Sequence, residues 1–140
     1  MAYELPGQVI LGTLTASSDY NDAADQFCFV TSTGTNFKKV TTAGAPVLGV
    51  LQDRPSSGTA GAIAVSGVTK VRVLNTTHTA IAVMDKLRCS TLGGAMPSTA
   101  NVGYYVVGRA LEALGSNTTG IITMLITHQG AGSSGTPSGA

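Results

Sequence analysis

The chain has 140 residues and a formal net charge of +1; 43% of its residues are hydrophobic and only 11% are charged. This length predicts one domain that buries about two thirds of its unfolded surface, without needing a disulfide or a metal to hold it together. The near balance of basic and acidic residues argues against nucleic acid as the main partner, because phosphate binding needs a clustered excess of lysine and arginine. A charged fraction far below the roughly 25% of soluble domains predicts a surface largely covered by neighbouring subunits.

The N-terminal segment is not expected to act as a targeting signal. Residues 1–7 have neither the basic start nor the apolar stretch of a signal peptide, and no apolar run reaches the roughly 18 residues of a membrane span. We therefore expect a protein that is made in the cytoplasm and has no membrane partner. Residues 1–14 are predicted to form an arm and a first strand, although a strand that caps the same domain is an equally good interpretation. Three residues of the arm are candidate partner contacts: Tyr3, Leu5 and Pro6.

Short apolar stretches separated by small polar residues continue from residue 15 to 129, which we predict to be the β domain. None has a convincing 3.6-residue period, so helices are not expected. Candidate strands cover residues 9–14, 27–31, 37–41, 47–51, 62–66, 68–74, 80–89, 103–111 and 121–127. The second and third are predicted to form a hairpin with a connection over residues 32–36. We predict an all-β fold, a compact sandwich or barrel of short, mostly antiparallel strands with extended N- and C-terminal arms.

One local pattern occurs twice within this domain. The stretches 47–67 and 106–126 each run from an apolar strand ending in glycine, through an acidic residue and a small-residue turn, into a second apolar strand. The same displacement relates the glycines at both ends of the pattern (108 − 49 = 120 − 61 = 59). The pattern predicts two similar β-hairpins in one sheet system. Residues 130–140 contain only Gly, Ala, Ser, Thr and Pro, a composition typical of a flexible tail.

Few side chains in the sequence are suited to chemistry. Cys28 and Cys89 lie in apolar stretches with no second cysteine nearby, so buried free thiols are favoured over a disulfide or a reactive thiol. His78 and His128 have no cysteine or carboxylate at ligand spacing and are expected to be surface or loop residues. The chain also lacks the Gly-x-Ser-x-Gly turn of a hydrolase. We therefore expect no catalytic site, no metal and no cofactor.

Charge alternation indicates a possible contact surface. Because alternate residues of a strand share a face, Lys70 and Arg72 lie on one predicted strand face and Lys86 and Arg88 on another. The four side chains could form a basic stripe that meets an acidic loop of the next copy in a ring of subunits. The alternative is two ordinary solvated faces. The acidic loop, residues 15–25, contains three candidate contacts: Asp19, Asp22 and Asp25.

The order of apolar motifs between Pro46 and Thr127 resembles that of the small phage capsid cement proteins of the DUF2190 type. The motifs that carry the resemblance are Val47-Leu48-Gly49-Val50, Ser66-Gly67-Val68-Thr69-Lys70-Val71, Ile81-Ala82-Val83-Met84-Asp85-Lys86-Leu87, Val106-Val107-Gly108-Arg109-Ala110-Leu111-Glu112 and the strand from Ile121 to Ile126. Met84 departs from the pattern, because the family tends to have glycine before this aspartate. The resemblance implies a β-rich decoration protein, often trimeric, that binds the outside of a tailed-phage head after expansion and contacts the major capsid protein. It implies no catalytic residues.

These observations favour a structural protein that stabilises capsomer junctions on a virion. A second hypothesis is another virion part, such as a tail-tube or fibre-associated β domain. A third is a carbohydrate-binding module displayed on a particle, which the absence of tryptophan and an aromatic content of 5% disfavour. An enzyme would require titratable residues gathered in a cleft, and the seven acids and two histidines are scattered along the sequence.

Overall fold

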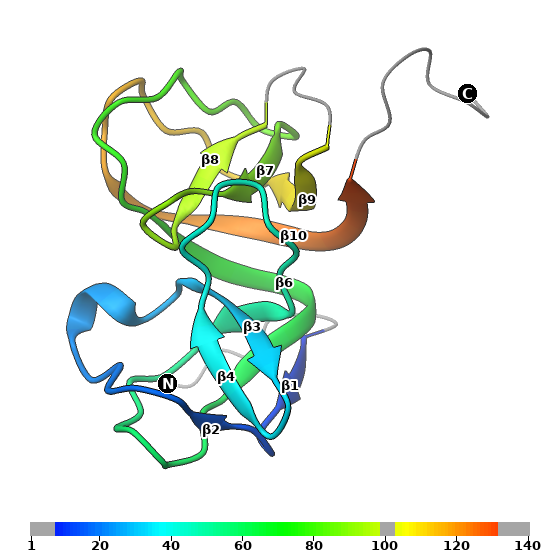
Figure 1. The fold of residues 1–140 in the computed structure, drawn as a ribbon. Helices are drawn as coiled ribbons and strands as arrows, with labels where there is room; N and C mark the ends of the chain where they lie inside the picture. Colours follow the sequence, from blue (N-terminus) through cyan, green and yellow to red (C-terminus); the bar gives the residue numbers. More distant parts are fainter. Residues whose placement is uncertain (1–7, 99–102, 132–140) are drawn as a thin grey trace.

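The computed structural model describes residues 8–98 and 103–131, the last two by their backbone alone, and these residues are almost entirely β (Figure 1). The strands are β1 (Val9–Leu11), β2 (Thr15–Ala16), β3 (Phe29–Thr33), β4 (Asn36–Lys39), β5 (Gly49–Leu51), β6 (Ile63–Val73), β7 (Lys86–Cys89), β8 (Ala95–Pro97), β9 (Tyr105–Ala110) and β10 (Gly120–Ala131). A single turn of 3-10 helix, η1 (Ala23–Asp25), precedes β3. Every described strand pair except β2 with β4 is antiparallel. The predicted all-β fold of short, mostly antiparallel strands is confirmed, whereas the predicted arms fall largely outside the described residues.

One long strand joins two groups of strands. The sheet order is β2-β4-β3-β5-β6-β10-β9-β7-β8, with β1 added to β6 off this path. The first half of β6 pairs with β1 and β5, and its second half, from Gly67 to Val73, pairs with β10. Figure 1 accordingly shows β6 crossing the molecule between β1–β4 on one side and β7–β10 on the other. Within the described ranges, no helix has the length and apolar composition that a membrane crossing needs.

The sheet contains an internal repeat of four strands. Moving outward from the central β6–β10 pair, the order is β5, β3, β4 on one side and β9, β7, β8 on the other. The first repeat is therefore β3–β6 and the second is β7–β10. The β5–β6 and β9–β10 pairs lie in the two similar stretches of sequence, and each is extended by a further hairpin, β3–β4 or β7–β8.

The backbone conformations support this repeat independently. The ten described residues with positive φ form five pairs at equivalent places: Phe27 and Met84, Gly34 and Gly93, Gly44 and Gly103, Gly58 and Asn117, and Gly67 and His128. The displacement is 57 residues for the first pair (84 − 27), 59 for the next three (93 − 34, 103 − 44 and 117 − 58) and 61 for the last (128 − 67). Because positive φ is uncommon outside glycine, this correspondence means that the two repeats follow the same backbone path.

The observed strands differ from the predicted ones most clearly in three places. The expected strands 62–66 and 68–74 are one strand, β6, which continues through Gly67 at a φ of 86°. The expected strand 80–89 begins only at Lys86, because the chain turns at 82–85, where the Asp85 amide donates to the Ala82 carbonyl. The hairpin of β3 and β4 exists, but its turn is shorter than expected, since Thr33 already pairs with Asn36.

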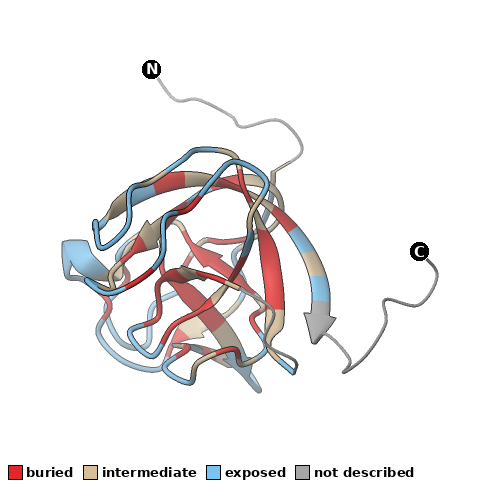
Figure 2. Ribbon diagram, turned by 90° about the horizontal axis from the view of Figure 1, so that it is seen from above, coloured by how far each residue is buried: buried red, intermediate tan, exposed pale blue. Residues whose placement is uncertain are grey.

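Two hydrophobic clusters stabilise the sheet, and buried residues line its strands while exposed residues gather in the turns and at η1 (Figure 2). The smaller cluster lies in the first repeat, where Ala16 and Tyr20 of the N-terminal segment pack with Phe37, whose ring centroid is 5.9 Å from that of Tyr20. The larger cluster draws on both repeats, including Phe29 of β3 and Leu87 of β7. The repeats therefore share one interior.

Candidate functional site

One side of the sheet carries a concentration of positive charge across the neighbouring strands β6, β10, β9 and β7. Lys70 pairs with Thr123 and Arg72 with Ile121, while Leu125 pairs with Arg109, and Arg109 with Lys86. Directly paired residues project from the same side of a sheet. These seven residues are exposed or half-buried, whereas the intervening Val71, Leu87, Ala110, Ile122 and Met124 are buried. We call the four cations Lys70, Arg72, Lys86 and Arg109 the basic face.

Three of the four residues predicted to form a basic stripe belong to this face, and the fourth does not. The Arg88 guanidinium lies 4.5 Å from the ring centroid of Tyr104 and donates to the Cys89 carbonyl oxygen. The Arg88 Nε atom is buried. Arg88 is therefore held by its own chain, and Arg109 takes the fourth place on the face.

Each of the three predicted contact residues in the acidic loop forms a hydrogen bond or an ion pair within its own chain. Asp19 accepts a hydrogen bond from the Ser57 amide at 2.8 Å, and Asp22 accepts one from the Ala24 amide at the start of η1. Asp25 forms an ion pair with Lys39, with 2.7 Å between Oδ1 and Nζ. These contacts shape the loop, and Asp19 and Asp22 remain exposed.

Arg72 connects the basic face to this same loop. Its Nε donates to the Gln26 carbonyl at 2.9 Å, and its Nη2 donates to the Ala23 carbonyl at 2.9 Å. Arg72 thus contacts the backbone of this loop in its own chain, whereas the predicted contact of the stripe with the loop of a neighbouring copy stays a prediction. The other predicted contacts, Tyr3, Leu5 and Pro6, lie outside the described residues.

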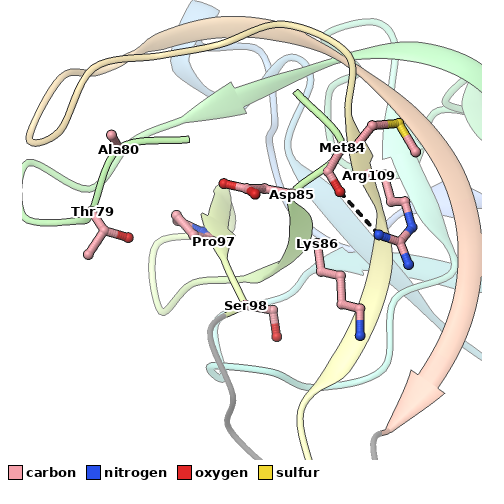
Figure 3. A pocket seen from close by; sticks show the side chains of 8 residues that line it. All are labelled: Thr79, Ala80, Met84, Asp85, Lys86, Pro97, Ser98 and Arg109. Atoms are coloured by element: carbon pink, nitrogen blue, oxygen red, sulfur yellow. Dashed lines mark hydrogen bonds between the residues drawn. The ribbon is translucent and has the colours of Figure 1, made fainter. Parts of the chain in front are cut away.

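A cavity of about 450 Å³ opens beside the basic face (Figure 3). It is lined by Thr79, Ala80, Met84, Asp85, Lys86, Pro97, Ser98 and Arg109. Lys86 and Arg109 are directly opposite each other on β7 and β9. The Lys86 carbonyl accepts a hydrogen bond from the Ser98 amide, which follows β8. The backbone hydrogen-bonding groups of Lys86 therefore point toward β8 and away from β9. The two cations therefore form a non-hydrogen-bonded pair, the arrangement in which cross-strand side chains stand closest.

The other polar groups of the cavity are used locally. Asp85 Oδ2 accepts from the Ala82 amide at 2.8 Å, and Arg109 Nη1 donates to the Met84 carbonyl at 3.1 Å. Figure 3 shows the Asp85 carboxylate directed toward Ala80, away from the ends of the Lys86 and Arg109 side chains. We call this cavity, with its two opposed cations, the Lys86–Arg109 pocket.

A β-bulge shapes one wall of this pocket. The Met84 amide donates to the Ala110 carbonyl at 2.7 Å, and the Ala110 amide donates to the Asp85 carbonyl at 2.9 Å, so two residues of one segment oppose one residue of β9. The first of the two, Met84, has a φ of 75°. This is the bulge type in which glycine normally takes the first position. The first repeat has the same bulge, with Phe27 in place of Met84 and Leu51 as the opposed residue.

The two repeats differ most at the positions of the opposed cations. In the first repeat the equivalent pair is Phe29 and Val50, displaced by 57 (86 − 29) and 59 (109 − 50) residues and also directly paired. Both of these side chains are fully buried in the shared hydrophobic cluster. The same side of the sheet is therefore interior in one repeat and open to solvent, with two cations, in the other.

The cysteines have no place in this site. Cys28 and Cys89 are free and buried, as predicted. Burial raises the pKa of Cys28 to about 11 and that of Cys89 to about 12. Because the thiolate is the reactive form, both thiols are unreactive near neutral pH. Among the residues that the structure describes, no group of three or more His, Cys, Asp or Glu side chains is arranged to hold a metal ion.

The histidines are more enclosed than expected. His78 lies in a loop but is buried, with Nδ1 2.6 Å from the Thr79 carbonyl and Nε2 2.8 Å from that of Thr118. His128 lies within β10, where Nδ1 is 2.8 Å from the Tyr105 hydroxyl and Nε2 is 2.9 Å from the Val65 carbonyl. Both rings link segments far apart in the sequence. The expectation of a surface or loop residue is confirmed for His78, which lies in a loop although it is buried, and was wrong for His128, which is half-buried in a strand.

Arg109 is the site residue that the sequence analysis missed. Comparison of the two sequence copies could have found it. Arg109 follows Val-Val-Gly in the second copy, and Val50 follows Val-Leu-Gly at the same place in the first. A charged residue at a position that is apolar in the other copy marks a place where the two copies serve different roles.

Comparison with known proteins identifies a fold neighbour. No protein-family model and no curated protein matches the sequence. Among solved structures, the chain is similar to the N base of the head fibre gp8.5 of bacteriophage phi29, with 15% sequence identity and a TM-score of 0.57. The match covers 88% of this chain and 97% of that one. At this identity the likeness shows a common fold.

Proposed function

We propose that this protein is a non-enzymatic structural component of a tailed-phage virion that decorates the outside of the assembled head. The observation that carries the proposal is the likeness of fold over 88% of the chain to the base of a phage head fibre. The resemblance of the apolar motifs to DUF2190-type cement proteins supports the same class from the sequence. The weakly charged surface also suits a protein that is covered by neighbours in an assembly.

The proposed action is to bridge capsomers of the major capsid protein and so stabilise their junctions. Each copy buries a modest surface across a junction, and the regular lattice repeats this contact many times. The shell then resists internal pressure without any single strong bond. Self-association, with a trimer as the expected form, would place several copies of the basic face around one junction.

The second candidate function is the base of a head fibre, favoured by the same fold neighbour. In that role the protein would anchor a further chain or domain to the head. A carbohydrate-binding module is less well supported, because the residues that line the Lys86–Arg109 pocket include no aromatic ring on which a sugar could stack.

Co-sedimentation with purified phage shells tests the proposal. We expect the protein to sediment with expanded shells and to remain in solution with unexpanded shells, because a decoration protein uses contacts that expansion creates. Release of the packaged genome on heating should also require a higher temperature after decoration. Failure to bind either shell would overturn the proposal, and binding to isolated tails alone would do the same.

A further inference from the structure

We infer that the Lys86–Arg109 pocket is a binding site for a carboxylate side chain of a protein partner. This inference goes beyond the proposed function, because the pocket would accept the carboxylate whichever protein carries it. It depends on three features of the described residues: two opposed cations, the contrast with the first repeat, and an apolar rim that contains a strained residue.

The opposed cations are the first argument. Like charges directly opposite on neighbouring strands destabilise a sheet, yet Lys86 and Arg109 form such a pair. In the part of the chain that the structure describes, the ion pair within 4.0 Å joins Lys39 to Asp25, so no described carboxylate lies within 4.0 Å of either cation, and Asp85, which also lines the cavity, bonds to the Ala82 amide instead. A carboxylate placed between them would replace repulsion by charge-assisted hydrogen bonds, and an arginine can bind such a group with two parallel bonds.

The first repeat supplies the second argument. There the equivalent Phe29 and Val50 side chains are covered by the shared hydrophobic cluster. The second repeat keeps the same backbone but presents its cations to a cavity of about 450 Å³. A side of the sheet that is covered in one copy is thus left open in the other, and its apolar pair is replaced by positive charge. Because positive charge replaces the apolar pair, the group that covers this side of the second repeat would be negatively charged.

The rim of the pocket supplies the third argument. Val83 is 54% exposed and Met84 is 52% exposed, and Met84 lines the cavity. An exposed methionine at a cavity with opposed cations, preceded in the chain by an exposed valine, resembles the mixed composition of a protein interface, where methionine and arginine are enriched. Met84 also holds a positive φ, and such local strain is concentrated at binding and switch sites.

These features favour a protein partner over other anionic ligands. An acidic sugar would be expected to stack on an aromatic ring, and no lining residue has one. A protein can insert a glutamate or aspartate between Lys86 and Arg109 while its neighbouring apolar residues contact Val83 and Met84. The partner's carboxylate would then bind the two cations inside the pocket, which gives specificity. Its neighbouring apolar residues would remove Val83 and Met84 from water, which favours binding.

The test is a titration of the full, isotope-labelled chain with an N-acetylated tetraglutamate peptide, followed by amide chemical shifts. We expect saturable shifts confined to residues 79–86, Ser98 and Arg109. The Lys86→Gln/Arg109→Gln double variant should bind at least tenfold more weakly. Lys38→Gln, which removes an exposed lysine of β4, is the matched control and should bind within twofold of the wild type. The double variant should be at least as stable as the wild type, because it lacks the repulsion between the opposed cations, and such a result shows that its loss of binding is not a loss of structure.

Several results would overturn the inference. These are shifts that do not saturate, equal binding of tetraglutamine, or equal binding by the double variant. Tenfold tighter binding of glucuronate or of inorganic phosphate would reassign the pocket to a sugar or a phosphate ligand and would also contradict it. Co-sedimentation separates this inference from the proposed function. If the wild type binds the peptide but no shell, the proposed function is refuted and the inference about the pocket still holds. If the wild type binds shells and this binding requires Lys86 and Arg109, both are supported.

Discussion

Single residues show where the backbone of this protein is strained. Phe27 and Met84 occupy equivalent bulge positions with φ values of 67° and 75°, although the left-handed region costs a non-glycine residue roughly 1–2 kcal/mol. Phe27 is half-buried beside the larger hydrophobic cluster, so packing offsets its strain. Met84 is more than half exposed and has little packing to offset it.

Replacing Met84 by glycine should therefore stabilise the protein. Relief of the left-handed conformation outweighs the extra chain entropy of glycine in the unfolded state, which is about 0.5–1 kcal/mol. We expect Met84→Gly to raise the free energy of unfolding by about 0.5 to 1 kcal/mol, measured by urea denaturation. Val83→Gly is the control and should lower the stability, because Val83 has no positive φ to relieve. A less stable Met84→Gly variant would show that the methionine side chain contributes more than its strain costs.

At the scale of elements, two glycines allow the paired strands of each repeat to approach closely. A Cβ atom added at Gly49 would lie well inside van der Waals contact with the Ala64 carbonyl oxygen, and one added at Gly108 would meet the Leu125 carbonyl oxygen in the same way. Both obstacles are backbone atoms of the facing strand, so a rotamer change cannot relieve them. The requirement for glycine in β5 and β9 thus follows from the spacing of the hairpins.

Gly108→Ala should consequently disturb the β9–β10 pairing. We expect a loss of about 3 kcal/mol in the free energy of unfolding, at the upper end of the usual cost of overpacking. Gly12→Ala is the matched control, since a Cβ atom there would meet nothing within 4 Å, and its effect should be within about 0.5 kcal/mol. Thermal unfolding followed by circular dichroism measures both. Equal stability of the two variants would mean that β9 can shift away from Leu125 without penalty.

At the scale of the whole molecule, the two repeats are one folding unit. β6 contributes residues to both halves of the sheet, and the larger hydrophobic cluster contains residues of both repeats. Backbone hydrogen bonds also cross between them, as from the Phe29 amide to the Gly93 carbonyl and from the Gly44 amide to the Cys89 carbonyl. The larger cluster is complete only when both repeats are folded, so unfolding of one removes support from the second.

The two buried thiols can report this cooperativity, since Cys28 belongs to the first repeat and Cys89 to the second. Burial raises both pKa values, to about 11 and about 12, so at pH 8 the native thiols are protonated and should resist alkylation. We expect both to become reactive over the same range of urea concentration, coincident with the loss of the β signal in circular dichroism. Labelling of Cys89 at a clearly lower urea concentration than Cys28 would show that the second repeat unfolds separately.

The sequence by itself determined the all-β class, the hairpin of β3 and β4, and the duplicated stretches around β5–β6 and β9–β10. These features are local, because alternation and small-residue turns act over a few residues. The sequence also placed Lys70 with Arg72, and Lys86 with Arg88, on shared strand faces, since alternation alone decides that. It could not locate the strand break before Lys86, because Met84 adopts a conformation that its residue type disfavours.

Only the tertiary structure decided which strands meet beyond a hairpin and which faces are covered. It joined two expected strands into β6, buried His78, drew Arg88 onto Tyr104, and set Lys86 opposite Arg109. The physical reason is that strand neighbours distant in sequence are selected by the burial of a shared interior. That burial depends on the whole chain at once, so the same backbone pattern is core at Phe29 and Val50 and an open cationic pocket at Lys86 and Arg109.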